Sequence, residues 1–535
     1  MKNLVGPVRT GCYDVLNNKN HHQRGAATMT QTGFFFQYEV YEKETGQTSL
    51  AGLPLYLDLM NRMGLDRIIS ANIKAREKSQ GWTDSEMIHS LILLNLAGGD
   101  CVSDLQVLEG DEGFRRLLNR VRLHGLKRKE RRALEVRWRK ERKRSTPSES
   151  AVFRYLSCFH DSEQENLRPE SGAFIPAANE YLQGFRQVCG AMAGFAFGQN
   201  HEKTATLDMD ATLVESRKET ARYCYKMFPG YQPFNVWWSE QEIILHTEFR
   251  DGNVPAGYEQ LRILKEALEL LPEGVEKVRV RSDTAGYQHE LLKYCEMKEN
   301  ERFGRIEFAI GCDVTPAFKK AVLEVSEEDW HTIYKEKDGR LVDTGRQWAE
   351  VCFVPNAIGH SKKGAQYRYL ATREVIRQRR LPGLEDTISL PFPVIEMEKD
   401  RYKVHGFVTN MDWNGEVLID WLYQRCGKSE EAHAVMKDDL AGGKLPSGDF
   451  GENAAWWWIM ILAFNLNAIM KQQVLGKEWA RKRMKAIRYH VIGLAGRVVK
   501  RSRSLFVQLS GDHPSTGLLF RAREKIGSLV ALPTG

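Results

Sequence analysis

The chain has 535 residues, of which 42% are hydrophobic and 27% charged, and its formal net charge is +7. This composition is globular and excludes wholesale disorder, and the length predicts two to four domains instead of a single core. The nine cysteines are scattered singly, with no Cys-x-x-Cys pair. Their spacing argues against a disulfide framework or a zinc knuckle and favours a reducing cytoplasm.

The N-terminal part divides into a polar segment and a helical region. We expect residues 1–47 to be poorly ordered, because the first thirty residues hold few apolar positions. The N-terminus also has no apolar stretch typical of a signal peptide. Residues 48–200 predict a mainly helical DNA-binding region. Within it, Thr83-Asp-Ser-Glu86 has the form of a capping box ahead of an apolar helix, which Gly98-Gly99-Asp100 ends.

A basic block occupies residues 127–144 of the helical region. It holds eleven Lys or Arg residues and three Glu residues, a local net charge of +8. One interpretation is a solvated helix face or a linker. The sparse apolar positions favour the other, a surface that contacts the phosphate backbone of DNA and supplies affinity without reading sequence.

From residue 204 the pattern changes to alternating strands and helices. The expected strands cover 204–214, 231–238, 242–249, 277–283 and 305–311, and the expected helices cover 261–271 and 287–298. This order, β-β-β-α-β-α-β, is that of a ribonuclease-H-like domain, so we assign residues 201–311 to the first part of an α/β core. In such a domain a further helix supplies the last carboxylate.

That helix is delayed by an insertion. Residues 312–410 contain strand-like pieces and predict a β-rich insertion, which interrupts the ribonuclease-H-like core. Residues 411–475 then form the second part of the core, with a helix over 416–437 and another behind it over 453–470. Residues 476–535 form a basic C-terminal region.

The most apolar run of the chain is residues 454–464, which includes three consecutive Trp residues. The run is too short to span a bilayer, and Asn465 and Asn467 follow it. It therefore favours a buried helix, and we expect no membrane partner.

Three acidic residues stand in settings that suit a metal site. Asp210 lies in the first strand, Asp283 ends the fourth strand, and Glu430 lies on the delayed helix. Carboxylates are preferred ligands of Mg²⁺, and two such ions can activate a hydroxyl or water and stabilise the leaving oxygen at phosphorus. The pattern therefore predicts Asp210, Asp283 and Glu430 as catalytic metal ligands.

Two of these residues have close rivals. Asp208 lies two residues from Asp210 and shares its face of the strand, and we interpret Asp208 as a supporting group. Glu431 is rotated by about 100° from Glu430 on a helix. Seven residues make close to two turns, so Tyr423, Glu430 and Lys437 are expected to share one stripe. Asp251 and Asp313 stand in turn-like contexts, and we interpret both as structural.

Several motifs together resemble a known group of enzymes. They are Leu94-Asn-Leu-Ala-Gly-Gly-Asp100, Leu108-Glu-Gly-Asp-Glu-Gly-Phe114, Leu207-Asp-Met-Asp-Ala-Thr212, Glu248-Phe-Arg-Asp-Gly-Asn-Val-Pro-Ala-Gly257, Arg281-Ser-Asp-Thr-Ala-Gly-Tyr287 and Asp449-Phe-Gly-Glu-Asn-Ala-Ala-Trp456. The chain thereby resembles the DDE transposases of bacterial insertion sequences, in the hairpin-forming IS-four-like superfamily. Within that superfamily it is most similar to the thirteen-eighty insertion-sequence family, over roughly residues 48 to 505.

The superfamily carries a Tyr-Arg-Glu-Lys signature on the helix of its third carboxylate. Tyr423, Arg425, Glu430 and Lys437 match this signature, although the spacing of Arg425 to each neighbour differs by one residue. Lys428 is an alternative to Arg425. The resemblance implies that Tyr423, Arg425 and Lys437 hold DNA phosphates near a hairpin.

The resemblance also implies the activity. It implies a Mg²⁺-dependent enzyme, with Mn²⁺ as a substitute, that acts as a homodimer on terminal inverted repeats and target DNA in the bacterial cytoplasm, associated with the nucleoid. The expected function is the cutting and joining of an insertion sequence through a DNA hairpin. A non-transposing endonuclease of the same fold and a non-catalytic DNA-binding derivative are the alternatives. Inverted repeats flanking the gene would distinguish transposase from endonuclease.

Overall fold

The computed structural model describes residues 45–138, 142–337, 339–355, 367–376, 392–397, 400–502 and 504–532. The segment 1–47, expected to be poorly ordered, lies outside these residues except for its last three. Gln47 belongs to strand β1 (Gln47–Thr48), which pairs antiparallel with β15 (Gly496–Arg501).

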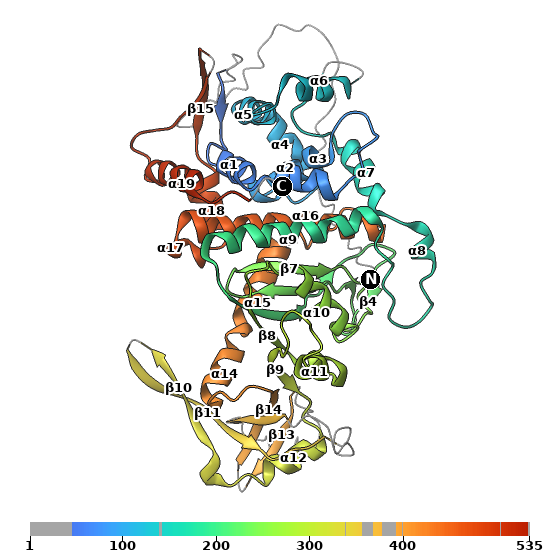
Figure 1. Ribbon diagram of the computed structural model, residues 1–535, viewed down its shortest axis with the longest axis vertical. Helices are drawn as coiled ribbons and strands as arrows, with labels where there is room; N and C mark the ends of the chain where they lie inside the picture. The colour runs from blue at the N-terminus through green and yellow to red at the C-terminus, as the bar shows by residue number, and fades with distance from the viewer. Residues whose placement is uncertain are drawn as a thin grey trace, which may run out of the picture. The chain divides into compact units, whose positions relative to one another are not determined.

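A mixed α/β architecture is built around one large sheet of ten strands (Figure 1). Its first part follows the predicted order of elements. These are β2 (Thr204–Ala211), β6 (Phe234–Trp238), β7 (Ile243–Glu248), α10 (Gln260–Glu269), β8 (Lys277–Ser282), α11 (His289–Glu296) and β9 (Glu307–Cys312). In space the strands run β7-β6-β2-β8-β9, and β8 is parallel to both of its neighbours.

The β-rich part expected over 312–410 continues this same sheet. Its elements are α12 (Pro316–Leu323), a short turn of helix (Glu327–Asp329), β10 (His331–Lys337), β11 (Arg340–Val351), β12 (Arg368–Val375), β13 (Val394–Met397) and β14 (Asp400–Thr409). Strand β14 pairs antiparallel with β9, for example Phe407 with Gly311. The hydrogen-bonded ladder therefore runs without a break from the first part of the sheet into these strands.

The region before the sheet consists mainly of helices. Its α-helices are α1 (Pro54–Met63), α2 (Leu65–Asn72), α3 (Asp84–Ala97), α4 (Leu105–Gly110), α5 (Glu112–Arg122), α6 (Arg128–Val136), α7 (Glu149–Leu156), α8 (Ser162–Asn166) and α9 (Glu180–Asn200). The capping box before α3 is confirmed, because Thr83 and Glu86 bond each other's backbone N–H.

Helix α16 (Phe450–Ile469) lies between the helical region and the sheet, beside α9 (Figure 1). All its residues are buried, and its polar side chains bond both neighbours. Asn465 accepts from the Ile244 N–H at 2.8 Å and donates to the Ile244 carbonyl at 2.7 Å on β7. Asn467 accepts from the Tyr56 hydroxyl on α1 at 2.8 Å. These bonds satisfy the side-chain amides of Asn465 and Asn467, which are buried on an otherwise largely apolar helix.

The helical stretch Phe450–Leu475 is longer than the most apolar run of the sequence, residues 454–464. By length and composition it could span a membrane, and Asp84–Ala97 with Val102–Gly110 could do so as one bent pair. The most apolar window of Phe450–Leu475 is wholly buried within the protein. The prediction of a buried helix is confirmed.

The single helix expected over 416–437 is interrupted. Helix α14 (Gly415–Tyr423) ends at Gln424, α15 (Arg425–Ala434) follows, and a π-helical turn covers Val435–Asp439. Gly427 has φ +90°, which lies in the left-handed region that glycine adopts without a steric penalty. These interruptions change the angular spacing on which the expected stripe of Tyr423, Glu430 and Lys437 depends.

Between β2 and β6, the short strands β3 (Val214–Glu215), β4 (Arg222–Tyr223) and β5 (Pro229–Tyr231) form a separate small sheet. The last elements of the chain follow α16. They are a π-helical turn (Met470–Leu475), α17 (Lys477–Ala480), α18 (Met484–Ile487), a second π-helical turn (Arg488–Ile492), β15, β16 (Ser504–Gln508) and α19 (Thr516–Ser528). Strands β1, β15 and β16 form a small sheet, so the start and the end of the described chain are joined.

Candidate active site

The parallel pairing of β2 with β8 brings two of the predicted carboxylates together. The register pairs Met209 with Ser282, so Asp210 and Asp283 follow side by side at the ends of adjacent strands. Asp283 also caps a short turn of helix (Thr284–Gly286), accepting from the Ala285 N–H at 3.0 Å. Sheet topology thus positions both side chains at one edge.

The two carboxylates line one open cleft of about 600 Å³. Partial desolvation raises the pKa of Asp283, and the negative charge of Asp210 raises it further. Tyr223 and Tyr225 line the same cleft and are 66% and 71% exposed. The cleft therefore combines repelling carboxylates with accessible aromatic rings.

Helix α15 contacts Asp210 through two side chains. The Ser429 hydroxyl donates to Asp210 Oδ2 at 2.6 Å, and Arg425 Nη1 forms an ion pair with the same oxygen at 3.1 Å. Arg425, expected to hold DNA phosphate, thus balances the charge of a candidate metal ligand. Sequence reasoning did not single out Ser429, although its spacing of four residues from Arg425 placed both on one helical face.

His433 was also missed, and it lies one further turn along α15. Burial, opposed by the charge of Asp210 and aided by the positive charges of Lys437 and Arg425, lowers the pKa of His433 to about 4. The ring is therefore neutral at physiological pH. Lys437 donates to the Leu213 carbonyl at 3.2 Å, just beyond the end of β2.

Glu430 and Glu431 are both exposed on α15. Glu430 directly follows Ser429 in the sequence. Glu431 instead acts on Lys471: burial lowers the pKa of Lys471, and the negative charge of Glu431 opposes that shift. Within the described chain, Asp210, Asp283 and Glu430 do not form a group whose ligand oxygens all lie within 4.8 Å of one another. The structure brings the two aspartates together and places Glu430 on the adjoining helix without closing the triad.

Tyr423 packs against strands of the β-rich part. Its hydroxyl lies 3.3 Å from Thr372 Oγ1 on β12, and its ring meets Phe407 on β14 edge-on. The side chain of Arg346 lies 5.6 Å above the Tyr423 ring. These contacts fix the end of α14 just before α15 begins.

Asp208 is buried in a network of its own. Arg281 on β8 binds it through two nitrogens at 2.5 and 2.7 Å, and also donates to the Trp421 carbonyl at 2.5 Å. Burial raises the pKa of Asp208, with Arg281 as the main opposing charge. Asp208 and Arg281 together thus join β2, β8 and α14, two residues before Asp210 on β2.

The two acidic residues interpreted as structural differ in setting. Asp251 is buried and pairs with Arg168 at 2.7 Å. Burial raises the pKa of Asp251 to about 6, against the charge of Arg168. Asp313 is exposed.

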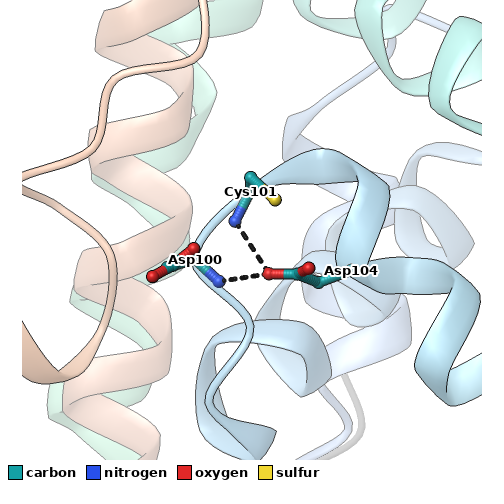
Figure 2. Close-up of side chains that lie close together, drawn as sticks. All are labelled: Asp100, Cys101 and Asp104. Atoms are coloured by element: carbon teal, nitrogen blue, oxygen red, sulfur yellow. Dashed lines mark hydrogen bonds between the residues drawn. The ribbon is translucent and has the colours of Figure 1, made fainter. Parts of the chain in front are cut away.

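Figure 2 shows a second group of potential ligands, Asp100, Cys101 and Asp104, whose ligand atoms do lie within 4.8 Å of one another. Asp104 Oδ2 accepts from the backbone N–H of Asp100 at 2.9 Å and of Cys101 at 3.2 Å. Asp100 also pairs with Lys444. These bonds account for the cluster as the cap of a short turn of helix (Val102–Asp104).

The chemistry of the cleft fits a divalent cation. Asp210 and Asp283 offer the oxygen ligands that hard cations prefer, and their mutual repulsion would be relieved by positive charge between them. Arg425 already supplies one positive charge at this position, through its ion pair with Asp210.

Comparison with known proteins identifies the family. The sequence matches the family described as transposase DDE domain group 1 over residues 36–531. The chain belongs to this family. It is therefore a DDE transposase, an enzyme of DNA transposition and recombination whose partner is DNA, and such transposases generally use divalent metal ions.

One solved structure that is similar to this transposase is a piggyBac transposase synaptic complex with hairpin DNA. The TM-score is 0.41 and the identity 13%, over 84% of this chain and 81% of that one. No curated protein matches the sequence.

Replacing Asp208 is expected to destabilise the transposase. Asp208→Asn leaves the buried guanidinium of Arg281 without its counter-charge, which costs about 3–5 kcal/mol. Urea unfolding of wild type and variant measures the loss. Asp313→Asn removes an exposed carboxylate and is the matched control, with an expected change within about 0.5 kcal/mol. An Asp208→Asn variant as stable as the control would show that the ion pair does not hold the strands together.

Proposed function

We propose that this chain is the transposase of a bacterial insertion sequence of the thirteen-eighty family, in the IS-four-like superfamily. It cuts and joins DNA ends by phosphoryl transfer at Asp210, Asp283 and Glu430. The adjacent placement of Asp210 and Asp283 at one cleft carries the proposal. Catalysis of this type needs carboxylates that converge from separate elements.

The sheet supports a ribonuclease-H-like core for this chemistry. If its first five strands, β2, β6, β7, β8 and β9, are numbered 1 to 5 along the chain, they lie side by side in the order 3-2-1-4-5. Strands 1, 4 and 5 run parallel to one another. The first strand, β2, carries Asp210, and Asp283 directly follows the fourth, β8. The α/β arrangement thus puts the candidate ligands on the two central strands.

The proposed ions are Mg²⁺ or Mn²⁺, held by Asp210, Asp283 and Glu430. Bound there, they would supply charge stabilisation to the attacking and leaving oxygens at phosphorus. The chain's own residues must first rearrange. Arg425 has to release Asp210, and α15 has to move so that Glu430, the neighbour of Ser429, approaches the aspartates. The glycine at 427 provides a place for that movement.

The proposed substrate is a terminal inverted repeat, bound by a homodimer in the bacterial cytoplasm, associated with the nucleoid. The transposon end is nicked, and the freed 3′-hydroxyl attacks the opposite strand to form a hairpin. Water reopens the hairpin, and the 3′-end then joins target DNA. Tyr423, Arg425 and Lys437 lie on or beside α15 and would hold phosphates during these steps.

The first test removes each carboxylate in turn. Asp210→Ala, Asp283→Ala and Glu430→Ala are expected to abolish strand cleavage, because each removes a ligand, while DNA binding survives through phosphate contacts elsewhere. A denaturing gel of labelled ends and a binding titration measure the two effects.

Glu431→Ala is the matched control for Glu430→Ala, since both carboxylates are exposed on α15. It should cleave at close to the wild-type rate. Near wild-type nicking by any of the three variants would remove that residue from the proposed site. Equal loss in Glu431→Ala would overturn the choice of Glu430 over Glu431.

The second test separates nicking from hairpin processing. Arg425→Ala and Lys437→Ala should each nick the end but fail to form or resolve the hairpin, because one lost charged contact costs about 1.5–3 kcal/mol where it is made. Intact and pre-cut ends are compared on denaturing gels. Lys444→Ala, which removes a lysine paired with Asp100, is the control. Equal failure at nicking and at hairpin opening would assign Arg425 and Lys437 to general DNA docking instead.

A further inference from the structure

A second cleft, of about 780 Å³, lies in the helical region. It is formed where the loop before α3 meets α7 and the chain that leads into α7. Six of its lining residues are cationic, and no Asp or Glu is among the described residues that line it; the six are Arg76, Arg137, Arg142, Lys143, Arg144 and Arg154. Trp82 and Trp138 complete the apolar part of the wall.

Two of the six cations hold the wall together. Arg137 donates to the carbonyls of Gly81 at 3.1 Å and Arg76 at 2.9 Å. Arg142 lies 4.0 Å above the Trp82 ring and pairs with Glu86 at 2.7 Å. These contacts are internal to the protein and need no ligand.

Three other cations have no counter-charge among the described residues. Arg144 donates through Nε to the Thr146 carbonyl, and Arg154 donates through Nε to the Ser150 carbonyl. Across the described part of the chain, neither these two nor Lys143 forms an ion pair with a carboxylate. All three are exposed, so their charged groups are available to a ligand.

The charges behind the wall are also unbalanced. Glu86 is shared between Arg142 and Arg122, which lies 3.6 Å from it. Burial and the charge of Arg142 lower the pKa of Arg122 to about 9, against the opposing charge of Glu86. One carboxylate, Glu86, therefore serves two guanidiniums, and among the described residues no Asp or Glu lines the cleft.

Helix α6 extends this cationic surface. It has no buried residue and carries Arg128, Lys129, Arg131 and Arg132, and it ends one residue before Arg137 of the cleft. A helix that buries none of its residues contributes little to a core. Its charge and position continue the cleft into an extended track, which suits a chain of phosphates better than a single small anion.

We propose that this cleft binds the phosphodiester backbone of DNA, with Lys143, Arg144 and Arg154 as the contacting cations. The inference rests on the proposed function only in taking DNA as the partner. Guanidinium groups match phosphate oxygens in a planar, two-pronged geometry, and lysine adds a point charge. The contacts are made to phosphates, so they supply affinity without sequence preference.

The test measures how DNA affinity depends on salt. Full-length protein is titrated onto a labelled duplex of unrelated sequence in EDTA, which prevents cleavage, and anisotropy is followed between about 50 and 200 mM salt. The triple variant Lys143→Gln, Arg144→Gln, Arg154→Gln should lower the magnitude of the log–log slope by about 2 to 3, since each lost phosphate contact removes about 0.9.

The control removes the same charge elsewhere. Lys293→Gln, Lys298→Gln and Lys320→Gln are exposed substitutions outside the cleft, and the slope should stay near the wild-type value. A conservative Arg144→Lys, Arg154→Lys variant should also keep it, which separates charge from folding.

Three results would overturn the inference. An unchanged slope in the triple variant, or an equal change in the control, would exclude the cleft as a phosphate track. Displacement of DNA by inorganic phosphate at micromolar concentration would assign the cleft to a small anion. If wild-type protein bound no DNA at all, the proposed function itself would fail, whereas binding with equal slopes would leave that function intact.

Discussion

Repulsion between two carboxylates is the constraint around which the core is arranged. Parallel pairing of β2 with β8 holds Asp210 and Asp283 at adjacent strand ends, and the charge of Asp210 raises the pKa of Asp283. Such a pair is stable only if positive charge is available. The protein supplies it from Arg425, which pairs with Asp210, while Arg281 neutralises the neighbouring Asp208. The same demand for positive charge fits divalent metal at this position.

The position of α15 depends on the β-rich part of the sheet. Helix α14 packs its apolar face on that part, where Gly415 lies so close to the Trp348 ring that a Cβ there would meet it at 2.1 Å. Tyr423 then contacts β12 and β14 at the end of α14. The strands inserted between Asp283 and Glu430 thus set where α15, and with it Ser429, meets Asp210.

The sequence predicted the large features because they depend on local patterns. Alternating strands, the capping box at Thr83 and the adjacency of Asp210 and Asp283 follow from period and order alone. The contacts of Arg425 and Ser429 with Asp210 did not, because they depend on where α15 packs against β2, 219 residues away for Ser429, and no local pattern fixes that position. The pairing of Asp208 with Arg281, 73 residues apart, requires the strand register.

The central claim is that Asp210 and Asp283 hold the catalytic metal. The most direct measurement is anomalous scattering from Mn²⁺ in crystals of the transposase bound to a DNA end. The account predicts a peak between the two aspartates, with oxygen ligands at about 2.1 Å and Arg425 no longer paired with Asp210. A peak at the Asp100–Asp104 cluster with none at the aspartates, or Arg425 still bound to Asp210 beside an ordered DNA end, would contradict it.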